Sequence, residues 1–230
     1  MDALVKNLLG ELNVETVFTI PIFGGIPISE SIVVTWIMIA AVLLISLLLT
    51  RNLKLDHPGK GQLALEGAVQ WLWNFFHDTM QGQGQEYYYY LMSVMVYIGI
   101  ANLIGIIGFK PPTKDINVTV ALSLLSIILI QVSGWRKKGA KGYFKSYAKP
   151  IAIIAPLNVL ELGIKPLSLC MRLFGNVLGS FVIMELLKQV LPVFLPVVFS
   201  LYFDVFDGLI QAYVFVFLTA LFMCESMEDS

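Results

Sequence analysis

Charged side chains are scarce in this sequence. Of its 230 residues only 13% are Asp, Glu, Lys or Arg, whereas 57% are hydrophobic, and the mean hydropathy is +0.80. Soluble globular domains carry about 25% charged residues, so this composition excludes an ordinary soluble protein. Several apolar runs also reach the roughly 20 residues that a helix needs to cross a bilayer. The sequence therefore predicts a membrane protein with several spans.

Cysteine and histidine are rare as well, with two of each. Cys170 and Cys224 stand in apolar helical sequence, where a free cysteine acts as a small buried hydrophobic residue, so we expect no disulfide and no metal site. The sequence contains no phosphate-binding glycine loop, no metal-ligand spacing and no nucleophile beside a base. We therefore expect no cofactor, no catalytic site and no nucleic-acid partner. Residues 1–15 lack the features of a cleavable signal peptide, and we expect none.

The expected fold class is an all-α membrane protein, a single integral membrane domain over residues 1–230. Its five membrane helices are expected at residues 31–50, 87–109, 117–135, 157–190 and 193–227. The last two would each be about 50 Å long at 1.5 Å per residue. Because the hydrocarbon core is only about 30 Å thick, we expect these two helices to form a long, steeply tilted hairpin in the lipid bilayer.

Two further segments complete this organisation. Residues 62–80 look helical but carry charges and clustered aromatic rings, so we expect an amphipathic helix on the membrane surface. Residues 1–29 are expected to form an external N-terminal segment. The loops after the first and third spans hold nine of the fifteen Lys and Arg residues, which predicts that these loops are cytoplasmic. The N-terminus then lies outside and the C-terminus in the cytoplasm.

One arginine, Arg172, stands in the middle of the fourth span. Between Pro166 and Leu187 the only other charge is Glu185. A guanidinium at the bilayer centre costs from about 3 to more than 10 kcal/mol, so it needs a partner. On a helical projection Arg172 shares one stripe with other residues of its span, and Glu185 points away from it. The stripe also contains Glu161, Lys165, Ser168, Asn176 and Gly179.

The fifth span offers carboxylates that could pair with this arginine. Asp204, Asp207 and Gln211 follow one another at i, i+3 and i+7, on one helix face. One interpretation is an internal ion pair of Arg172 with Asp204 or Asp207. The other is that Arg172 meets a carboxylate that is not permanently present, and that the acids line water-filled access routes.

Three other features have more than one interpretation. Gly175 and Gly179 are four residues apart and allow a helix to approach closely, either from this chain or from another. Glu161 and Lys165 form an i, i+4 pair that could simply compensate charge within the helix. Asp115 precedes the third span, either as a helix cap or as a polar residue of an ion path.

Residues 165–176, KPLSLCMRLFGN, resemble the signature of subunit a of F-type ATP synthase. Residues 210–228 resemble the family's last helix, with Gln211 at its signature glutamine, and DINVTVALSL after the outer turn fits as well. The similarity covers most of the chain from about Leu53 onward. The residues that match the first signature in order and spacing are Lys165, Pro166, Arg172, Leu173, Phe174, Gly175 and Asn176.

The resemblance implies a function in rotary ion translocation. Subunit a of this family lies beside a rotating ring of c subunits, each with a carboxylate in the membrane, and offers two offset half-channels for H⁺ or Na⁺. Its arginine meets the ring carboxylate and blocks a direct leak, so that ion flow turns the ring and drives ATP synthesis elsewhere. The implied partners are the c-ring, the peripheral-stalk b subunits and the rest of the F0F1 complex. The implied location is a bacterial-type plasma membrane, in preference to a plastid membrane.

Candidate ion-translocation residues follow from the same resemblance. Arg172 takes the barrier role. Phe181 stands where many members have an acid, and we expect Glu185, one turn later on roughly the same face, to replace that acid. Asp204 stands where some members have histidine. We therefore expect Glu185, Asp204 and Asp207 in the outer half-channel. The full candidate set is Arg172, Asn176, Gln211, Glu185, Asp204, Asp207, Glu161, Lys165 and Asp115.

Two other classes of function remain open at this point. A secondary transporter could use Arg172 to hold an anionic substrate, and it would show discontinuous helices and internal repeats. The sequence has no repeat between its halves, and the fourth span looks unbroken around Arg172. A purely structural scaffold would tolerate the loss of Arg172 if the internal acids were neutralised too.

Overall fold

The structure is a computed structural model that describes residues 16–21, 26–51, 53–54, 59–146, 155–190 and 199–228. Its long helices are α2 (Glu30–Thr50), α3 (Lys60–Thr79), α4 (Tyr88–Leu103), α5 (Ile116–Ser146), α6 (Ala155–Val190) and α8 (Gly208–Met227). Shorter elements are β1 (Thr16–Ile20), β2 (Ile26–Ser29), η1 (Gln85–Tyr87), η2 (Ile104–Ile107), η3 (Pro112–Lys114) and η5 (Leu201–Asp207).

Within these residues, five segments are long and apolar enough to cross a membrane, which confirms the expected multi-span helical class. They are Glu30–Thr50, Gln85–Ile107, Ile116–Gly139, Leu160–Met184 and Leu201–Met227. Each overlaps one of the five expected spans, because a continuous apolar run is readable from the sequence alone.

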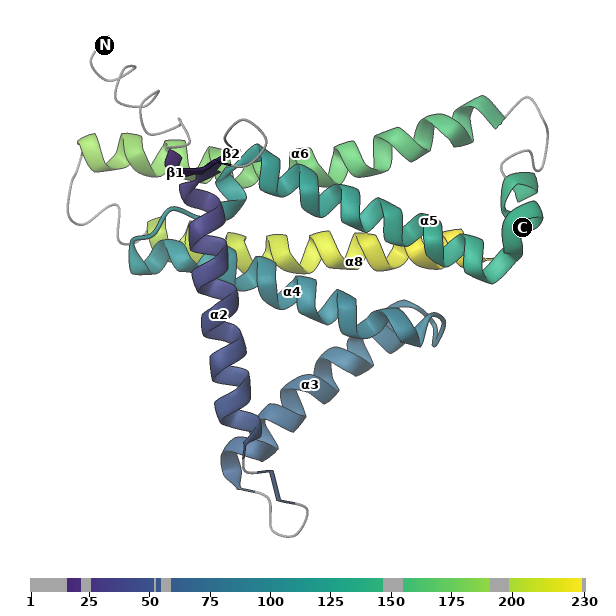
Figure 1. The fold of residues 1–230 in the computed structure, drawn as a ribbon, viewed down its shortest axis with the longest axis horizontal. Coiled ribbons are helices and arrows are strands. Elements are labelled where there is room, and N and C mark those ends of the chain that lie inside the picture. The colour runs from purple at the N-terminus through teal and green to yellow at the C-terminus, as the bar shows by residue number, and fades with distance from the viewer. Residues whose placement is uncertain are drawn as a thin grey trace.

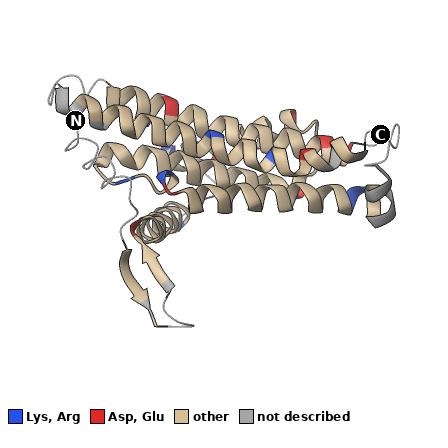
Figure 2. Ribbon diagram, turned by 90° about the horizontal axis from the view of Figure 1, so that it is seen from above, with Lys and Arg blue, Asp and Glu red and all other residues tan. Residues whose placement is uncertain are grey.

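Helices α4, α5, α6 and α8 lie side by side and form the main bundle (Figure 1). Helix α5 packs against both α6 and α8, and α8 also packs against α4. Helix α2 crosses this bundle at a steep angle and is seen end-on in Figure 2. Helix α3 runs from the end of α2 to the start of α4, outside the bundle (Figure 1). The arrangement leaves large faces of α2 and α6 open.

Aromatic packing fixes α3 against the bundle. The ring of Phe76 is buried, and Trp73 meets the ring of Tyr88 at 5.0 Å between centroids. On the neighbouring turn Phe75 lies 5.3 Å from the ring of Tyr213 in α8. The opposite face of α3 is exposed at Trp71. This division into a packed and an open face matches the amphipathic helix predicted at residues 62–80.

The third membrane helix extends beyond the predicted residues 117–135. Helix α5 continues to Ser146, with a kink at Gly139, where φ is 72°. Glycine adopts this left-handed conformation without a steric penalty. The basic sequence after Trp135, expected to be a loop, is therefore helical as far as Ser146. Residues 147–150 of that expected loop lie outside the described residues.

Two local features differ from the sequence-based expectation. Strands β1 and β2 pair as an antiparallel hairpin within the N-terminal segment, which the all-α prediction omits. The turn at residues 110–115, expected to be non-helical, contains one 3₁₀ turn that begins at Pro112. Proline is tolerated there because the first residues of a helix need no intrahelical N–H bond.

The fifth span also departs from a regular α-helix. Residues 193–198 of the predicted helix lie outside the described residues, and Leu201–Asp207 forms a π-helix before α8 begins. The Gly208 N–H donates to the carbonyl of Phe203, five residues earlier. A π-helix has more residues per turn than an α-helix. The common face predicted from α-helical spacing for Asp204, Asp207 and Gln211 therefore does not apply across this segment.

The close contact of α5 with α8 at Gly134 generates a prediction about stability. A methyl group at Gly134 would lie 2.7 Å from Cε2 of Tyr143 and 2.9 Å from the carbonyl oxygen of Ser226. Gly134→Ala should therefore destabilise the protein by about 1–3 kcal/mol through overpacking. Gly67→Ala, in α3, meets nothing within 4 Å and serves as the matched control, with a Tm that is unchanged or slightly raised. Equal Tm values for the two variants in detergent would contradict this packing.

Candidate functional site

Arg172 lies at the border between the packed and the open face of α6. Leu169 and Leu173, on one side of the helix, are fully buried, whereas Leu167 and Met171 on the other are 61% and 52% exposed. The Arg172 side chain itself is half-buried. Its guanidinium is thus carried by a packed helix at the edge of a surface that this chain leaves uncovered.

No acid pairs with Arg172 among the described residues. The ion pairs formed there join other side chains, and none links Arg172 to Asp204 or Asp207. The internal ion pair that the sequence allowed is therefore not formed. Helix α6 is also continuous from Ala155 to Val190, which disagrees with the broken helix expected of a secondary transporter.

The small residues next to Arg172 are open in the described chain. A methyl group built at Gly175 or at Gly179 would meet nothing within 4 Å. These glycines therefore do not serve to pack another described helix of this chain against α6. These open positions favour the interpretation of close approach by a helix from outside the chain.

Asn176 and Gln211 join α6 to α8 one turn from Arg172. The Nδ2 of Asn176 donates to the Oε1 of Gln211 at 2.6 Å. Gln211 is only 3% exposed, and its Nε2 has no hydrogen-bond partner within the described part of the chain. A buried amide donor without a partner costs free energy. The described residues therefore leave one buried amide donor, the Nε2 of Gln211, without a hydrogen-bond partner close to the arginine.

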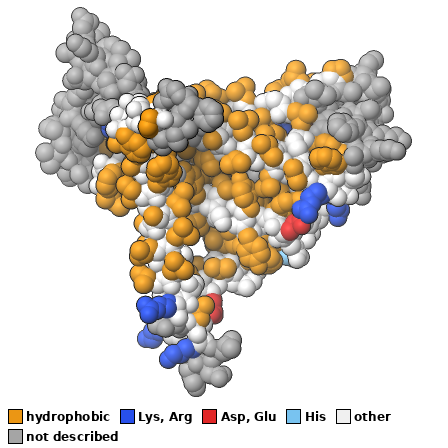
Figure 3. All heavy atoms as spheres, viewed as in Figure 1, with side chains coloured by type: hydrophobic (Ala, Val, Ile, Leu, Met, Phe, Trp, Pro, Cys, Tyr) orange, Lys and Arg blue, Asp and Glu red, His pale blue; other side chains and the backbone are white. Residues whose placement is uncertain are grey.

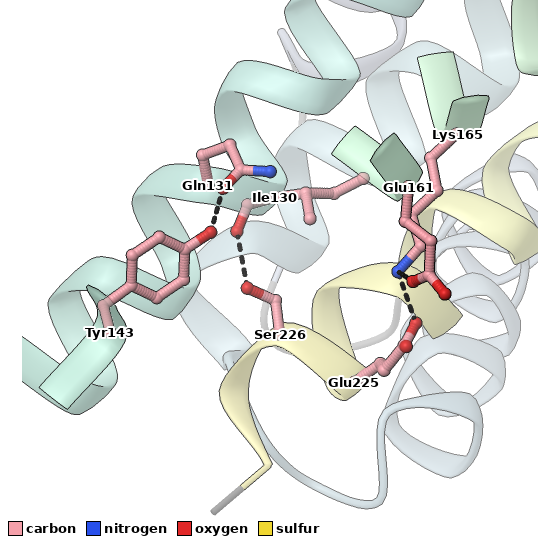
Figure 4. A network of polar contacts seen from close by, with 7 residues as sticks. All are labelled: Ile130, Gln131, Tyr143, Glu161, Lys165, Glu225 and Ser226. Carbon is pink, nitrogen blue, oxygen red and sulfur yellow. Dashed lines mark hydrogen bonds and ion pairs between the residues drawn. The ribbon is translucent and has the colours of Figure 1, made fainter. Parts of the chain in front are cut away.

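A second polar link joins the same two helices nearer the C-terminus. The Nζ of Lys165 lies 2.8 Å from Glu225 of α8 and 3.6 Å from Glu161 of its own helix (Figure 4). The pair of Glu161 and Lys165 is thus present, but the shorter contact runs to another helix. In the same region the hydroxyl of Ser226 donates to the carbonyl of Ile130 at 3.1 Å.

The two aspartates of the fifth span lie at the other end of that helix. Asp204 accepts a hydrogen bond from the hydroxyl of Ser200 at 2.7 Å, and Asp207 is half-buried. At about 1.5 Å per residue, the 21 positions from Asp204 to Glu225 span about 30 Å. Gln211 lies between them. Carboxylates therefore stand near both ends of this span, with the Arg172 region between.

Asp115 caps α5. Its Oδ1 accepts hydrogen bonds from the backbone N–H and from the Nδ2 of Asn117, both at 3.0 Å. Its Oδ2 also faces the hydroxyl of Ser29 at 3.5 Å. The carboxylate is only 3% exposed, so the helix-cap interpretation is confirmed. A role of Asp115 in ion transport stays a prediction.

The remaining candidate acid, Glu185, lies on α6. Phe181, which stands where many family members have an acid, lies on the same helix. The backbone of Glu185 belongs to this helix, but its side chain lies outside the described residues. Phe181 is described, and the ammonium of Lys114 lies 3.6 Å from the centre of its ring. A cation thus faces the position where an acid was expected from the family pattern.

Three polar residues of the site region were missed by the sequence analysis. Asn102 and Thr113 are buried and hydrogen-bonded to each other at 2.9 Å, and Glu225 pairs with Lys165. Asn102 could have been found by the argument applied to Arg172, since it is a polar side chain inside an apolar span. The partner of Glu225 lies 60 residues away in the chain, so only the packing reveals that pair.

The fold and the site together define a multi-pass helical membrane protein with charged and polar side chains on facing helices. Residues 32–224 match the family model described as ATP synthase A chain. ATP synthase subunit a of Moorella thermoacetica is 35% identical over 88% of this chain and 92% of its own length. The chloroplastic subunit a of Oedogonium cardiacum is 35% identical over 87% and 83%.

A third relative, described as sodium ion specific, is subunit a of Propionigenium modestum, 27% identical over 90% of this chain and 76% of its own. The match covers far more than half of the chain. The chain belongs to the ATP synthase subunit a family, as the sequence predicts.

The unpartnered amide of Gln211 generates a prediction that separates stability from function. Gln211→Met removes the buried Nε2 and keeps a side chain of similar length, so the free energy of unfolding should be unchanged or higher. Ion transport should fall, because the polar contact with Asn176 is lost. The check is the Tm of the purified protein together with ATP-driven ion uptake by the assembled complex. A clear fall in Tm would show that the hydrogen bond stabilises more than the orphaned amide costs.

Proposed function

We propose that this chain is the stator subunit a of a rotary ATP synthase and that Arg172 meets the membrane carboxylate of a neighbouring ring of c subunits. The observation that carries this proposal is that Arg172 has no acidic partner among the described residues. The glycines on the adjacent face are uncovered by the described chain. A charged group in a membrane needs a counter-charge, and the open face provides the place for one.

Two polar routes lead to this face from opposite ends. The outer route contains Asp204 and Asp207, together with Glu185 on α6 and Asp115 in the outer turn. The described carboxylates stand near both ends of the last span, with Arg172 and the Asn176–Gln211 pair between them, and this separation supports two half-channels rather than one continuous pore. The inner route contains Glu161, Lys165 and the newly found Glu225, and Asn176 and Gln211 flank the arginine.

Electrostatics explains how the arginine couples the two routes. A ring carboxylate that reaches Arg172 is attracted in its ionised form and releases its ion to one route. At low effective dielectric this attraction is strong, and partial hydration keeps it reversible. The positive charge also repels a cation that would pass directly between the routes. An ion must therefore travel around with the ring, and the rotation drives ATP synthesis in another part of the complex, without a catalytic site in this chain.

Charge distribution supports the proposed orientation. Lys and Arg side chains gather at the end of α2 and again at the edge of the molecule near the start of α4, with hydrophobic side chains between (Figure 3). Helix α3 runs between these two regions (Figure 1). Placing both on the cytoplasmic side follows the positive-inside rule and puts α3 along that membrane surface. The N-terminus is then outside and the C-terminus cytoplasmic, in a bacterial-type plasma membrane.

The proposed partners are the c-ring, the peripheral-stalk b subunits and the other subunits of the F0F1 complex. The transported ion is H⁺ or Na⁺. The relative from Propionigenium modestum is described as sodium ion specific, so sodium belongs in any test of this chain.

The role of Arg172 is tested by ATP-driven ion uptake into vesicles that hold the assembled complex. Arg172→Ala should reduce uptake to the level of vesicles without complex, because the ring carboxylate loses its counter-charge. Arg172→Lys should fail as well, since a compact ammonium does not reproduce the planar guanidinium. Arg51→Ala, at the exposed end of α2, is the matched control and should pump normally.

Measurements with and without sodium identify the ion in the same experiment. Uptake that requires sodium in the wild type names Na⁺, and sodium-independent acidification names H⁺. If assembled Arg172→Ala complexes pump at the wild-type rate, the proposed role of Arg172, and with it the proposed function, is wrong.

The open glycine face generates a separate prediction about assembly. Gly179→Leu should leave the Tm of the purified chain unchanged within about 1 °C, because a Cβ added at that position meets no neighbouring side chain or helix of the described chain within 4 Å. It should strongly reduce pumping or c-ring association, because the added side chain blocks close helix approach. Gly67→Leu on α3 is the control, as that glycine is equally open. Normal pumping by Gly179→Leu complexes would place the ring elsewhere.

A further inference from the structure

Asn102 connects three parts of the chain near the outer end of the bundle. It is only 4% exposed, although it stands in an apolar helix. Its Oδ1 accepts a hydrogen bond from the hydroxyl of Thr113 at 2.9 Å, and its Nδ2 donates to the carbonyl of Gly208 at 2.9 Å. The side chain therefore ties the turn before α5 to the first residue of α8.

The contact at Gly208 is made directly to the backbone. A methyl group at Gly208 would lie 2.9 Å from the Cβ of Asn102, so any side chain there would force the two helices apart. Gly208 is also the residue at which the π-helix ends, and its N–H reaches back to the carbonyl of Phe203. Asn102 thus holds the junction between the π-helix and α8.

The 3₁₀ helix η2, which directly follows α4, also touches the π-helix. Gly105 follows Asn102 by three residues, and a methyl group at Gly105 would lie 3.0 Å from the Oδ1 of Asp204. The absence of a side chain at Gly105 therefore provides the space that the Asp204 carboxylate occupies. Asn102 fixes the backbone of the fifth span, and Gly105 lets one of its acids approach α4.

We propose that Asn102 is a positioning residue that holds the π-helical turn in the register that turns Asp204 toward Gly105. π-Helical turns are rare and occur mostly as short insertions in α-helices. A shift to α-helical pairing would rotate Asp204 relative to α8 and withdraw it from that position. The inference rests on the proposed function, in which Asp204 belongs to the outer half-channel. Through Asn102, the packing of α4 sets how readily an outer ion reaches that carboxylate.

The test measures ATP synthesis by the assembled complex in vesicles, driven by an imposed ion gradient. The readout is the outer concentration of the coupling ion, H⁺ or Na⁺, that gives half-maximal synthesis. Asp204→Asn should raise this concentration. Asn102→Leu loses two buried hydrogen bonds, and the loss of the one to the Gly208 carbonyl at the junction should by itself raise it about fivefold. Ser93→Ala is the control on the same helix, because its hydroxyl bonds only to the Tyr89 carbonyl one turn earlier.

The double variant distinguishes positioning from general stability. If Asn102 acts through Asp204, Asn102→Leu should add nothing to the change caused by Asp204→Asn. Independent, additive shifts, or a loss of assembled complex without any shift, would overturn the inference. If Asp204→Asn instead shows the wild-type half-maximal outer concentration, Asp204 is not part of the outer half-channel, and the proposed role of Asn102 is also wrong.

Two milder variants keep the test decisive if Asn102→Leu does not assemble. Thr113→Val preserves shape and removes only the hydrogen bond to Asn102. Gly105→Ala leaves the Asn102 contacts in place and pushes directly on the Asp204 carboxylate. Both should raise the half-maximal outer concentration, and both should be silent in the Asp204→Asn background. If both variants keep the wild-type half-maximal concentration while Asp204→Asn raises it, the positioning role of Asn102 is rejected and the role of Asp204 is retained.

Discussion

An arginine inside a membrane is the constraint on which this structure depends. The guanidinium of Arg172 cannot lose its charge, and leaving it without a counter-charge in lipid is costly. The described part of the chain provides no carboxylate for it. Instead, α6 presents Arg172 at the border of an uncovered face lined by glycine. The cost is tolerable if a partner supplies the missing charge, so the arrangement makes sense for one subunit of a larger assembly.

The rest of the bundle packs against that helix and places polar side chains beside it at particular positions along its length. Leu169 and Leu173 anchor α6, while Gly134 and Gly208 allow α8 to approach α5 and α4 closely. Helices α6 and α8 are bridged by Asn176 and Gln211 beside the arginine. Carboxylates stand near both ends of the last span, at Asp204 and at Glu225, as the proposed pair of half-channels requires. At the other end of the last span, Asn102 is hydrogen-bonded to the Gly208 carbonyl at the residue where the π-helix ends.

The predicted spans agree with the structure because hydrophobicity is a local, one-dimensional property. The differences arise where local preference and tertiary packing compete. The basic sequence after Trp135 is helical on both sides of Gly139, whose non-helical backbone divides it with a kink. The π-helical turn moves Asp204 and Asp207 out of the pattern that α-helical spacing predicts. Neither the kink nor the π-helical turn can be recognised from the spacing of hydrophobic residues in the sequence.

The sequence by itself determined the class, the spans and the central arginine, since composition and a family signature are contained in the order of residues. It also located most of the polar residues that the proposed ion path uses, although not Glu225. Only the tertiary structure decided between an internal ion pair and an open face for Arg172. It alone joined Lys165 to Glu225 and Asn102 to Gly208. These contacts link residues 60 and 106 positions apart, and such pairings depend on how whole helices pack.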